Sequence, residues 1–63
     1  DLKRYENDCN DAIKVAVNQH EFDAAVSFHY NTGAIRGATW VKTLNRGDYV
    51  KAGTQIMNWS KPA

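Results

Sequence analysis

The sequence has one cysteine, one proline and almost no excess of charge, and each of these scarcities excludes a class of protein. A lone Cys9 excludes an internal disulfide framework and a zinc site built from cysteines alone. Eight basic residues face seven acidic ones, and a net charge of +1 does not indicate a nucleic-acid or anionic-membrane partner. No apolar stretch approaches the about 20 residues that a membrane helix needs, so we expect no membrane span in this segment.

A chain of 63 residues has about the size of one minimal domain, and its core must be thin. The hydrophobic share of 43% and the charged share of 24% are typical of an ordinary globular chain. Glycines at 33, 37 and 47 divide the sequence into periodic segments, and no segment alternates apolar and polar residues as a strand does. The single proline, Pro62, is placed to stop a helix near the C-terminus. These features predict an all-α fold, a small bundle of about four short helices.

Residues 2–17 show the spacing of three and four that puts apolar side chains on one stripe of a helix. The stripe consists of Leu2, Tyr5, Cys9, Ala12, Ile13, Ala16 and Val17. On the other side, Arg4 and Asp8 are spaced for an i,i+4 ion pair, which indicates a solvated face. We expect Cys9 to be a small buried thiol.

The second helix is predicted from its two ends. Asn18 followed three residues later by Glu21 is a variant of the capping box, and Gly33 is placed to adopt the left-handed conformation that ends a helix. His29 lies on the apolar face of this helix. We therefore expect His29 to be held in the packing with one ring nitrogen hydrogen-bonded. His20 and His29 are the only histidines, and without a nearby third ligand they predict no zinc site.

Two further helices are predicted from caps of the same kind. Thr39 is the expected N-cap of a helix over residues 39–45, and Gly47 is the candidate C-cap that ends it. Asp48 is the expected cap of a fourth helix. The apolar face of that helix consists of Tyr49, Ala52, Gly53, Ile56 and Trp59.

From residue 22 onward, short motifs keep their order and spacing across three predicted helices and their turns. They are Phe22-Asp23-Ala24, Val26-Ser27-Phe28, Asn31-Thr32-Gly33-Ala34, Thr39, Lys42-Thr43-Leu44-Asn45-Arg46-Gly47-Asp48-Tyr49, Ala52 and Asn58-Trp59. In this order they resemble the C-terminal lobe of phage-type lysozymes, the endolysin muramidases of bacteriophages and prophages. Residues 2–17 resemble the helix that precedes this block in that family. The sequence departs from the family pattern at His29, Ala38 and Trp40, where a small or apolar residue, a serine and an aliphatic residue are common.

The resemblance implies that residues 1–63 form one unit, the C-terminal helical lobe, without the N-terminal catalytic segment. It implies a parent protein that hydrolyses the bond between N-acetylmuramic acid and N-acetylglucosamine in peptidoglycan and acts on the bacterial cell wall, in the periplasm or at the host envelope. Such hydrolysis needs a carboxylic acid and a second group that attacks or activates water. Glu6 and Glu21, the only glutamates, are predicted on a solvated face and in a helix cap. We therefore assign no catalytic residue, cofactor or metal, and expect the chain to be inactive alone.

By the same resemblance, the end of the second helix faces the substrate groove, and the candidate substrate-binding residues are Tyr30, Asn31, Gly33 and Trp59. A tyrosine ring stacks on the apolar face of a sugar, and an asparagine amide both donates to and accepts from an N-acetyl group. Structural roles compete with these. Tyr30 can be an aromatic at the edge of the core, Asn31 a helix terminator, and the helical phase of Trp59 favours core packing.

Two other classes of function stay open. A helix-turn-helix that reads DNA is one, although its third segment offers only Lys42 and Arg46 to phosphates, and we expect no nucleic-acid partner. A helical protein-interaction module is the other, since a thin core can be completed by another chain. The expected partners are therefore a peptidoglycan glycan strand, together with the missing N-terminal lobe or a second copy.

Overall fold

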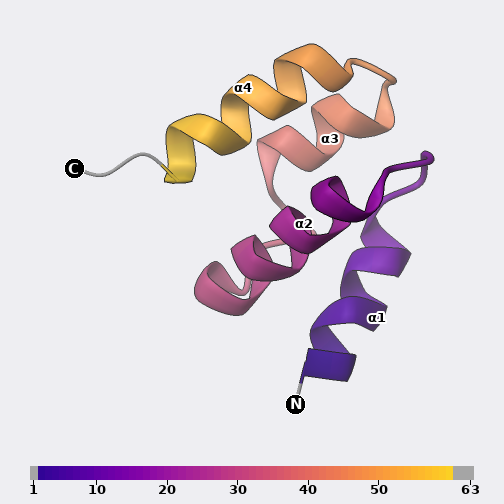
Figure 1. The fold of residues 1–63 in the computed structure, drawn as a ribbon, viewed down its shortest axis with the longest axis vertical. Helices are drawn as coiled ribbons and strands as arrows, with labels where there is room; N and C mark the ends of the chain where they lie inside the picture. The colour runs from indigo at the N-terminus through magenta and orange to yellow at the C-terminus, as the bar shows by residue number, and fades with distance from the viewer. Residues whose placement is uncertain (1, 61–63) are drawn as a thin grey trace.

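The computed structural model describes residues 2–60, which form four helices (Figure 1). They are α1 (Leu2–Ala12), α2 (Gln19–Thr32), α3 (Thr39–Asn45) and α4 (Tyr49–Ser60). α1 packs against α2 and α3 packs against α4, so the chain consists of two helix pairs with α2 in the middle. No strand occurs within residues 2–60, and the predicted all-α bundle is confirmed. Pro62, predicted to stop a helix, lies outside the described residues.

The first helix is shorter than its apolar period predicts, because it ends at Ala12 rather than near residue 17. Asn45 of α3 takes over hydrogen bonds that a continued helix would make. Its Oδ1 accepts a bond from the backbone N–H of Lys14 (2.7 Å), and its Nδ2 donates to the carbonyl of Ala12 (2.9 Å). The β-branched residues of the connection pack against the core from outside any helix, namely Ile13, Val15 and Val17.

Both ends of α2 are fixed as predicted. The Asn18 side chain accepts a bond from the Glu21 backbone N–H (2.8 Å), and the Glu21 carboxylate accepts one from the Asn18 backbone N–H (2.7 Å). At the other end, Gly33 has φ 68°, and its N–H donates to the carbonyl of His29 (2.7 Å). Glycine adopts this left-handed conformation without strain, so the direction in which the chain leaves α2 is set by Gly33.

The start of α3 differs by one residue from the prediction. Ala38 is the N-cap, because its carbonyl accepts the first helical bond, from the backbone N–H of Lys42 (3.3 Å). Its side chain makes no capping bond. Thr39 therefore lies in the first turn of α3 instead of capping it. The turn into α4 follows the prediction: Gly47 has φ 89°, and Asp48 Oδ1 accepts a bond from a backbone N–H in the first turn of α4 (3.1 Å).

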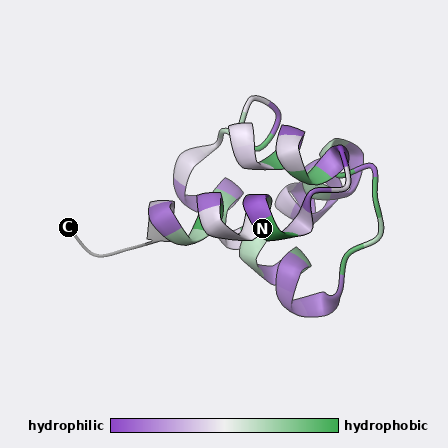
Figure 2. Cartoon of the chain, turned by 90° about the horizontal axis from the view of Figure 1, so that it is seen from above, coloured by the Kyte–Doolittle hydropathy of each residue, from purple (hydrophilic) through white to green (hydrophobic). Residues whose placement is uncertain are grey.

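The core is small and lies where α2 meets its neighbours. Figure 2 shows hydrophobic and hydrophilic bands alternating along the helices, as expected of amphipathic elements. The buried apolar residues are Cys9, Ala25, Phe28, Ile35, Trp40, Val41, Leu44 and Ala52. Phe28 meets Trp40 and Trp59 edge to face, with ring centroids 5.4 Å and 5.0 Å away. Phe28 therefore joins α2 to both α3 and α4. Cys9 is buried as predicted, and burial raises the pKa of its thiol to about 11.

Candidate functional site

The last turn of α2 presents two of the predicted substrate contacts to solvent. Tyr30 is 61% exposed, and Asn31 and the capping Gly33 are exposed beside it. Asn31 does not terminate the helix, because α2 continues to Thr32 and the Asn31 Nδ2 donates to the carbonyl of Ser27 one turn earlier (2.8 Å). This end of α2 is therefore an open polar and aromatic surface rather than part of the core.

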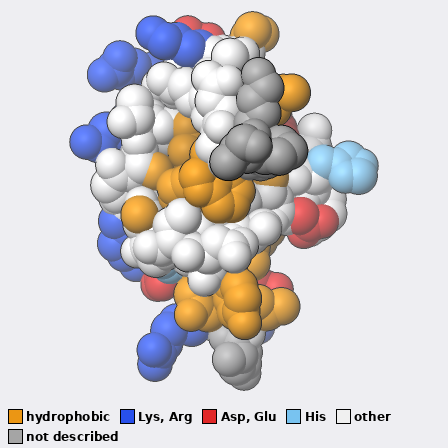
Figure 3. Space-filling model, turned by 90° about the vertical axis from the view of Figure 1, so that its left-hand side faces the viewer, with side chains coloured by type: hydrophobic (Ala, Val, Ile, Leu, Met, Phe, Trp, Pro, Cys, Tyr) orange, Lys and Arg blue, Asp and Glu red, His pale blue; other side chains and the backbone are white. Residues whose placement is uncertain are grey.

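Trp59, the fourth predicted contact, is only partly in the core. It lies in the last turn of α4, is 41% exposed, and packs one edge against Phe28. Within residues 2–60, Tyr30 and Trp59 make no ring contact with each other, since the ring partner of Tyr30 is Tyr5. Figure 3 shows the side of the molecule that lies on the left in Figure 1, with one group of hydrophobic side chains near its centre and another near its lower end. The structure thus brings Tyr30, Asn31 and Gly33 together and leaves Trp59 on a neighbouring element.

Tyr30 rests on α1 through Tyr5, a contact that the sequence analysis did not predict. The two rings meet edge to face, with centroids 5.3 Å apart and planes at 68°. Tyr5 also meets the His29 ring edge to face, with centroids 5.1 Å apart and planes at 72°. The helical period placed Tyr5 on the apolar stripe but carried no signal for its partners on another helix.

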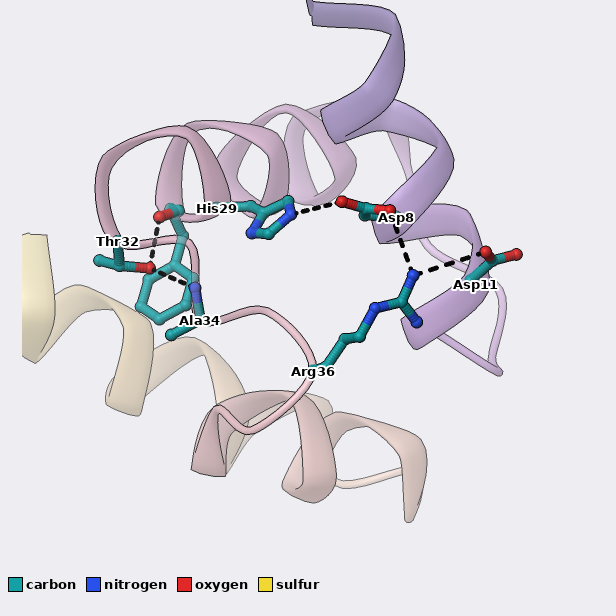
Figure 4. A network of polar contacts seen from close by, with 7 residues as sticks. Asp8, Asp11, His29, Thr32, Ala34 and Arg36 are labelled. Atoms are coloured by element: carbon teal, nitrogen blue, oxygen red, sulfur yellow. Dashed lines mark hydrogen bonds and ion pairs between the residues drawn. The ribbon is translucent and has the colours of Figure 1, made fainter.

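His29 also belongs to a polar network (Figure 4). The His29 Nε2 lies 2.8 Å from Asp8 Oδ2, and Arg36 donates to Asp8 Oδ1 (3.1 Å) while lying 3.6 Å from Asp11 Oδ2. His29 is buried with one ring nitrogen bonded, as predicted. The other nitrogen, Nδ1, is buried and has no hydrogen-bond partner among residues 2–60. The network ties α1, α2 and the connection after α2 to one another.

Asp8 faces α2, which corrects the predicted pairing with Arg4 on the solvent side. Its partners are His29 and Arg36, and its side chain is 29% exposed. The hydrogen bond with His29, followed by the bond and charge of Arg36, lowers the pKa of the Asp8 carboxyl below its ordinary value of 3.8. A carboxyl group with a lowered pKa is ionised at neutral pH, so Asp8 is unsuited to act as a general acid.

Of the two glutamates, Glu21 is engaged in the capping box of α2, and Glu6 is exposed on α1. Within the described part of the chain, no group of three His, Cys, Asp or Glu side chains is arranged to hold a metal ion. Among residues 2–60, no helix has the length and apolar character that crossing a bilayer requires.

Comparison with known proteins agrees with the motifs. The family model described as phage lysozyme matches residues 1–63. The chain belongs to the phage lysozyme family. The family indicated by the motifs of residues 22–59 is thereby confirmed.

Three endolysins illustrate how this phage lysozyme chain relates to longer proteins. It is 36% identical over 63 residues to the endolysin of Bacillus phage B103, and 38% identical over 63 residues to that of Bacillus phage PZA; each match covers 97% of this chain and 24% of the relative. It is 43% identical over 54 residues to the endolysin of Acyrthosiphon pisum secondary endosymbiont phage 1, covering 82% and 37%. The chain thus spans about a quarter of the Bacillus phage relatives. No solved structure matches it.

The three departures from the family pattern are each accommodated in this phage lysozyme chain. His29 gains Asp8 as a partner, and Trp40 is buried edge-on against Phe28. Ala38 leaves α3 without a side-chain cap, the one place where the departure removes a hydrogen-bonding group. The assignment therefore requires no distortion of the fold.

A hollow of about 250 Å³ lies elsewhere in the phage lysozyme chain, between α2, α3 and α4. Its lining includes His20, Trp40, Leu44, Ile56 and Met57. None of the four predicted substrate contacts lines it. The hollow begins at the N-terminal turn of α2, whereas Tyr30 and Asn31 lie in the last turn of that helix.

Substituting Asp8 with asparagine is expected to lower stability at neutral pH and to have less effect in acid. Because the pKa of Asp8 is lower in the folded than in the unfolded chain, its contribution is complete above the ordinary value of 3.8. It is lost as the pH falls through the folded pKa. Urea unfolding of both chains at pH 6 and pH 3 measures this, and a stability difference that is as large at pH 3 as at pH 6 would contradict the assignment.

Proposed function

We propose that this chain is the C-terminal lobe of a bacteriolytic muramidase, an enzyme that hydrolyses the bond between N-acetylmuramic acid and N-acetylglucosamine in peptidoglycan. The match of the phage lysozyme family over residues 1–63 supports this proposal, as do the endolysin relatives. In this proposal the chain supplies one wall of the substrate groove. The other wall and the bond-breaking groups come from the remaining lobe of the parent.

The observation that carries the binding role is a tyrosine ring exposed beside an amide at a rigidly capped helix end. Tyr30 offers an apolar ring face with a polar tip, which suits the C–H face of a pyranose. Asn31, next to it, can hydrogen-bond an N-acetyl group or a stem-peptide amide. Gly33 carries no side chain, and the space where a Cβ would stand is open, so a glycan strand can approach the backbone there.

The carboxyl groups support a binding role rather than a cleaving one. Glycoside hydrolysis needs one carboxyl that is protonated when the leaving oxygen departs. Asp8 is held ionised by His29 and Arg36, and Glu21 is engaged in a cap. Glu6 is exposed on α1, without the apolar surroundings that raise the pKa of a carboxyl. We therefore expect the 63-residue chain to bind peptidoglycan without clearing it.

Replacing Tyr30 with alanine is expected to weaken binding of the chain to purified peptidoglycan about two- to tenfold, the range that corresponds to about 0.5–1.5 kcal/mol of ring stacking. A pelleting assay with insoluble peptidoglycan measures the change. Val50→Ala is the matched control, because Val50 is 84% exposed at the start of α4. Binding that is lost equally in both variants, or clearing of the suspension by the chain alone, would overturn the proposal.

A further inference from the structure

We infer that Tyr5 is a positioning residue for Tyr30, fixing the exposed ring in the orientation in which it meets a sugar. The inference rests on the proposed substrate contact of Tyr30 and extends it from the surface of α2 to a residue on α1. Tyr5 is only partly exposed, whereas Tyr30 is 61% exposed. Tyr5 therefore acts through Tyr30 rather than on the glycan.

The arrangement is a continuous row of contacts from an ion pair to the surface. Asp8 binds His29 at 2.8 Å, His29 meets Tyr5 at 5.1 Å, and Tyr5 meets Tyr30 at 5.3 Å. Both ring contacts are edge to face, the geometry in which the positive edge of one ring meets the negative face of the other. The orientation of Tyr30 is thereby tied to a packed and hydrogen-bonded base.

Helix geometry explains why this row forms. Tyr5 and Asp8 are three residues apart on α1 and therefore share one face, whereas His29 and Tyr30 are consecutive on α2. The Tyr5 ring contacts both residues of α2, with its centroid 5.1 Å from that of His29 and 5.3 Å from that of Tyr30. Arg36, in the connection after α2, donates to Asp8 as well (3.1 Å), so rotation of the α1 face away from α2 would strain this ion pair together with the ring contacts.

The magnitudes favour a functional effect. An exposed side chain loses rotamer freedom when binding immobilises it. The free energy of an edge-to-face ring pair is of comparable size, so one ring contact can offset that cost before the glycan arrives. Removing Tyr5 should then weaken binding although every atom that touches sugar remains in place.

The test measures affinity for a soluble tetrasaccharide of alternating N-acetylglucosamine and N-acetylmuramic acid, by NMR titration of the 63-residue chain. Tyr5→Leu keeps an apolar helix-forming residue without a ring and is expected to bind about two- to tenfold more weakly. Tyr5→Phe keeps the ring and is expected to restore binding. Ile13→Ala is the control for a general loss of stability, because Ile13 packs on the core from the connection after α1.

The same spectra report the orientation directly. In the unsubstituted free chain we expect Tyr30 to populate a single χ1 rotamer, seen in its side-chain couplings, with nuclear Overhauser contacts to the Tyr5 ring. Rotamer averaging at Tyr30 would overturn the inference without any variant. Equal weakening by Tyr5→Leu and Ile13→Ala would overturn it too, since the effect would then be one of stability.

The two proposals fail in different ways. If Tyr30→Ala weakens tetrasaccharide binding and Tyr5→Leu does not, the positioning role is wrong and the substrate contact of Tyr30 stands. If Tyr30→Ala leaves binding unchanged, the proposed contact is wrong, and the positioning role is wrong with it.

Discussion

Replacing Phe28 with alanine is expected to remove a large part of the free energy that keeps the chain folded. Phe28 is buried and packs edge to face on both Trp40 and Trp59, so truncation opens a cavity at the junction of α2, α3 and α4. Substitutions of this kind cost about 3–5 kcal/mol. A domain of this size is stabilised by only about 3–9 kcal/mol, at roughly 0.05–0.15 kcal/mol per residue. Urea unfolding followed by circular dichroism measures the loss.

Phe28→Leu is the matched control, since it keeps most of the apolar volume and removes the two ring contacts. We expect it to fold and to lose less stability than the alanine variant, because it leaves a smaller cavity. Because Trp40 and Trp59 both contact Phe28, their fluorescence in the alanine variant should be that of solvent-exposed indoles. If the unfolding free energy of the alanine variant lies within about 1 kcal/mol of that of the unsubstituted chain, the core is not organised around Phe28.

The helix boundaries that could be predicted from the sequence depend on neighbouring residues. The Asn18 and Glu21 cap lies within three residues, and Gly33 ends α2 through its own φ of 68°. Asp48 likewise binds an amide of the turn that follows it. In these places the residues that decide the backbone lie next to one another, so a pattern of a few letters carries the whole signal.

The features that could not be predicted depend on residues from other elements. The apolar period continues to residue 17, yet α1 ends at Ala12, because the side chain of Asn45, 33 positions away, donates a hydrogen bond to the Ala12 carbonyl. Asp8 is spaced for Arg4 on its own helix but turns to His29. A single helical period describes a face and contains no information on the partner that covers it.

The candidate site divides in the same way. The resemblance to phage lysozymes named Tyr30 and Asn31 as candidate substrate contacts, and the structure places them at an exposed helix end. Their contact with sugar stays a prediction. The ring contact between Tyr5 and His29 could not be predicted from the sequence, because it depends on how α1 is rotated against α2.

Replacing Asn45 with alanine is expected to cost about 2 kcal/mol, because two hydrogen bonds of about 1 kcal/mol each are lost. The lost bonds join the end of α3 to Ala12 and Lys14, the residues where the chain leaves α1. Apart from these bonds, α1 is held mainly through α2. The expected result is therefore a lower unfolding free energy together with faster hydrogen exchange at the Lys14 amide, which loses its acceptor.

Asn45→Asp separates the two bonds. An aspartate still accepts from the Lys14 N–H but cannot donate to the Ala12 carbonyl, and its charge faces that oxygen instead. We expect the aspartate variant to keep slow exchange at the Lys14 amide while its unfolding free energy falls. In the alanine variant we expect the unfolding free energy to fall and the Lys14 amide to exchange faster. If exchange at Lys14 is equally slow in all three chains, Asn45 does not hold this connection. The early end of α1 must then come from the packing of Ile13, Val15 and Val17 and from the bond of the Tyr49 hydroxyl to the Ala16 carbonyl.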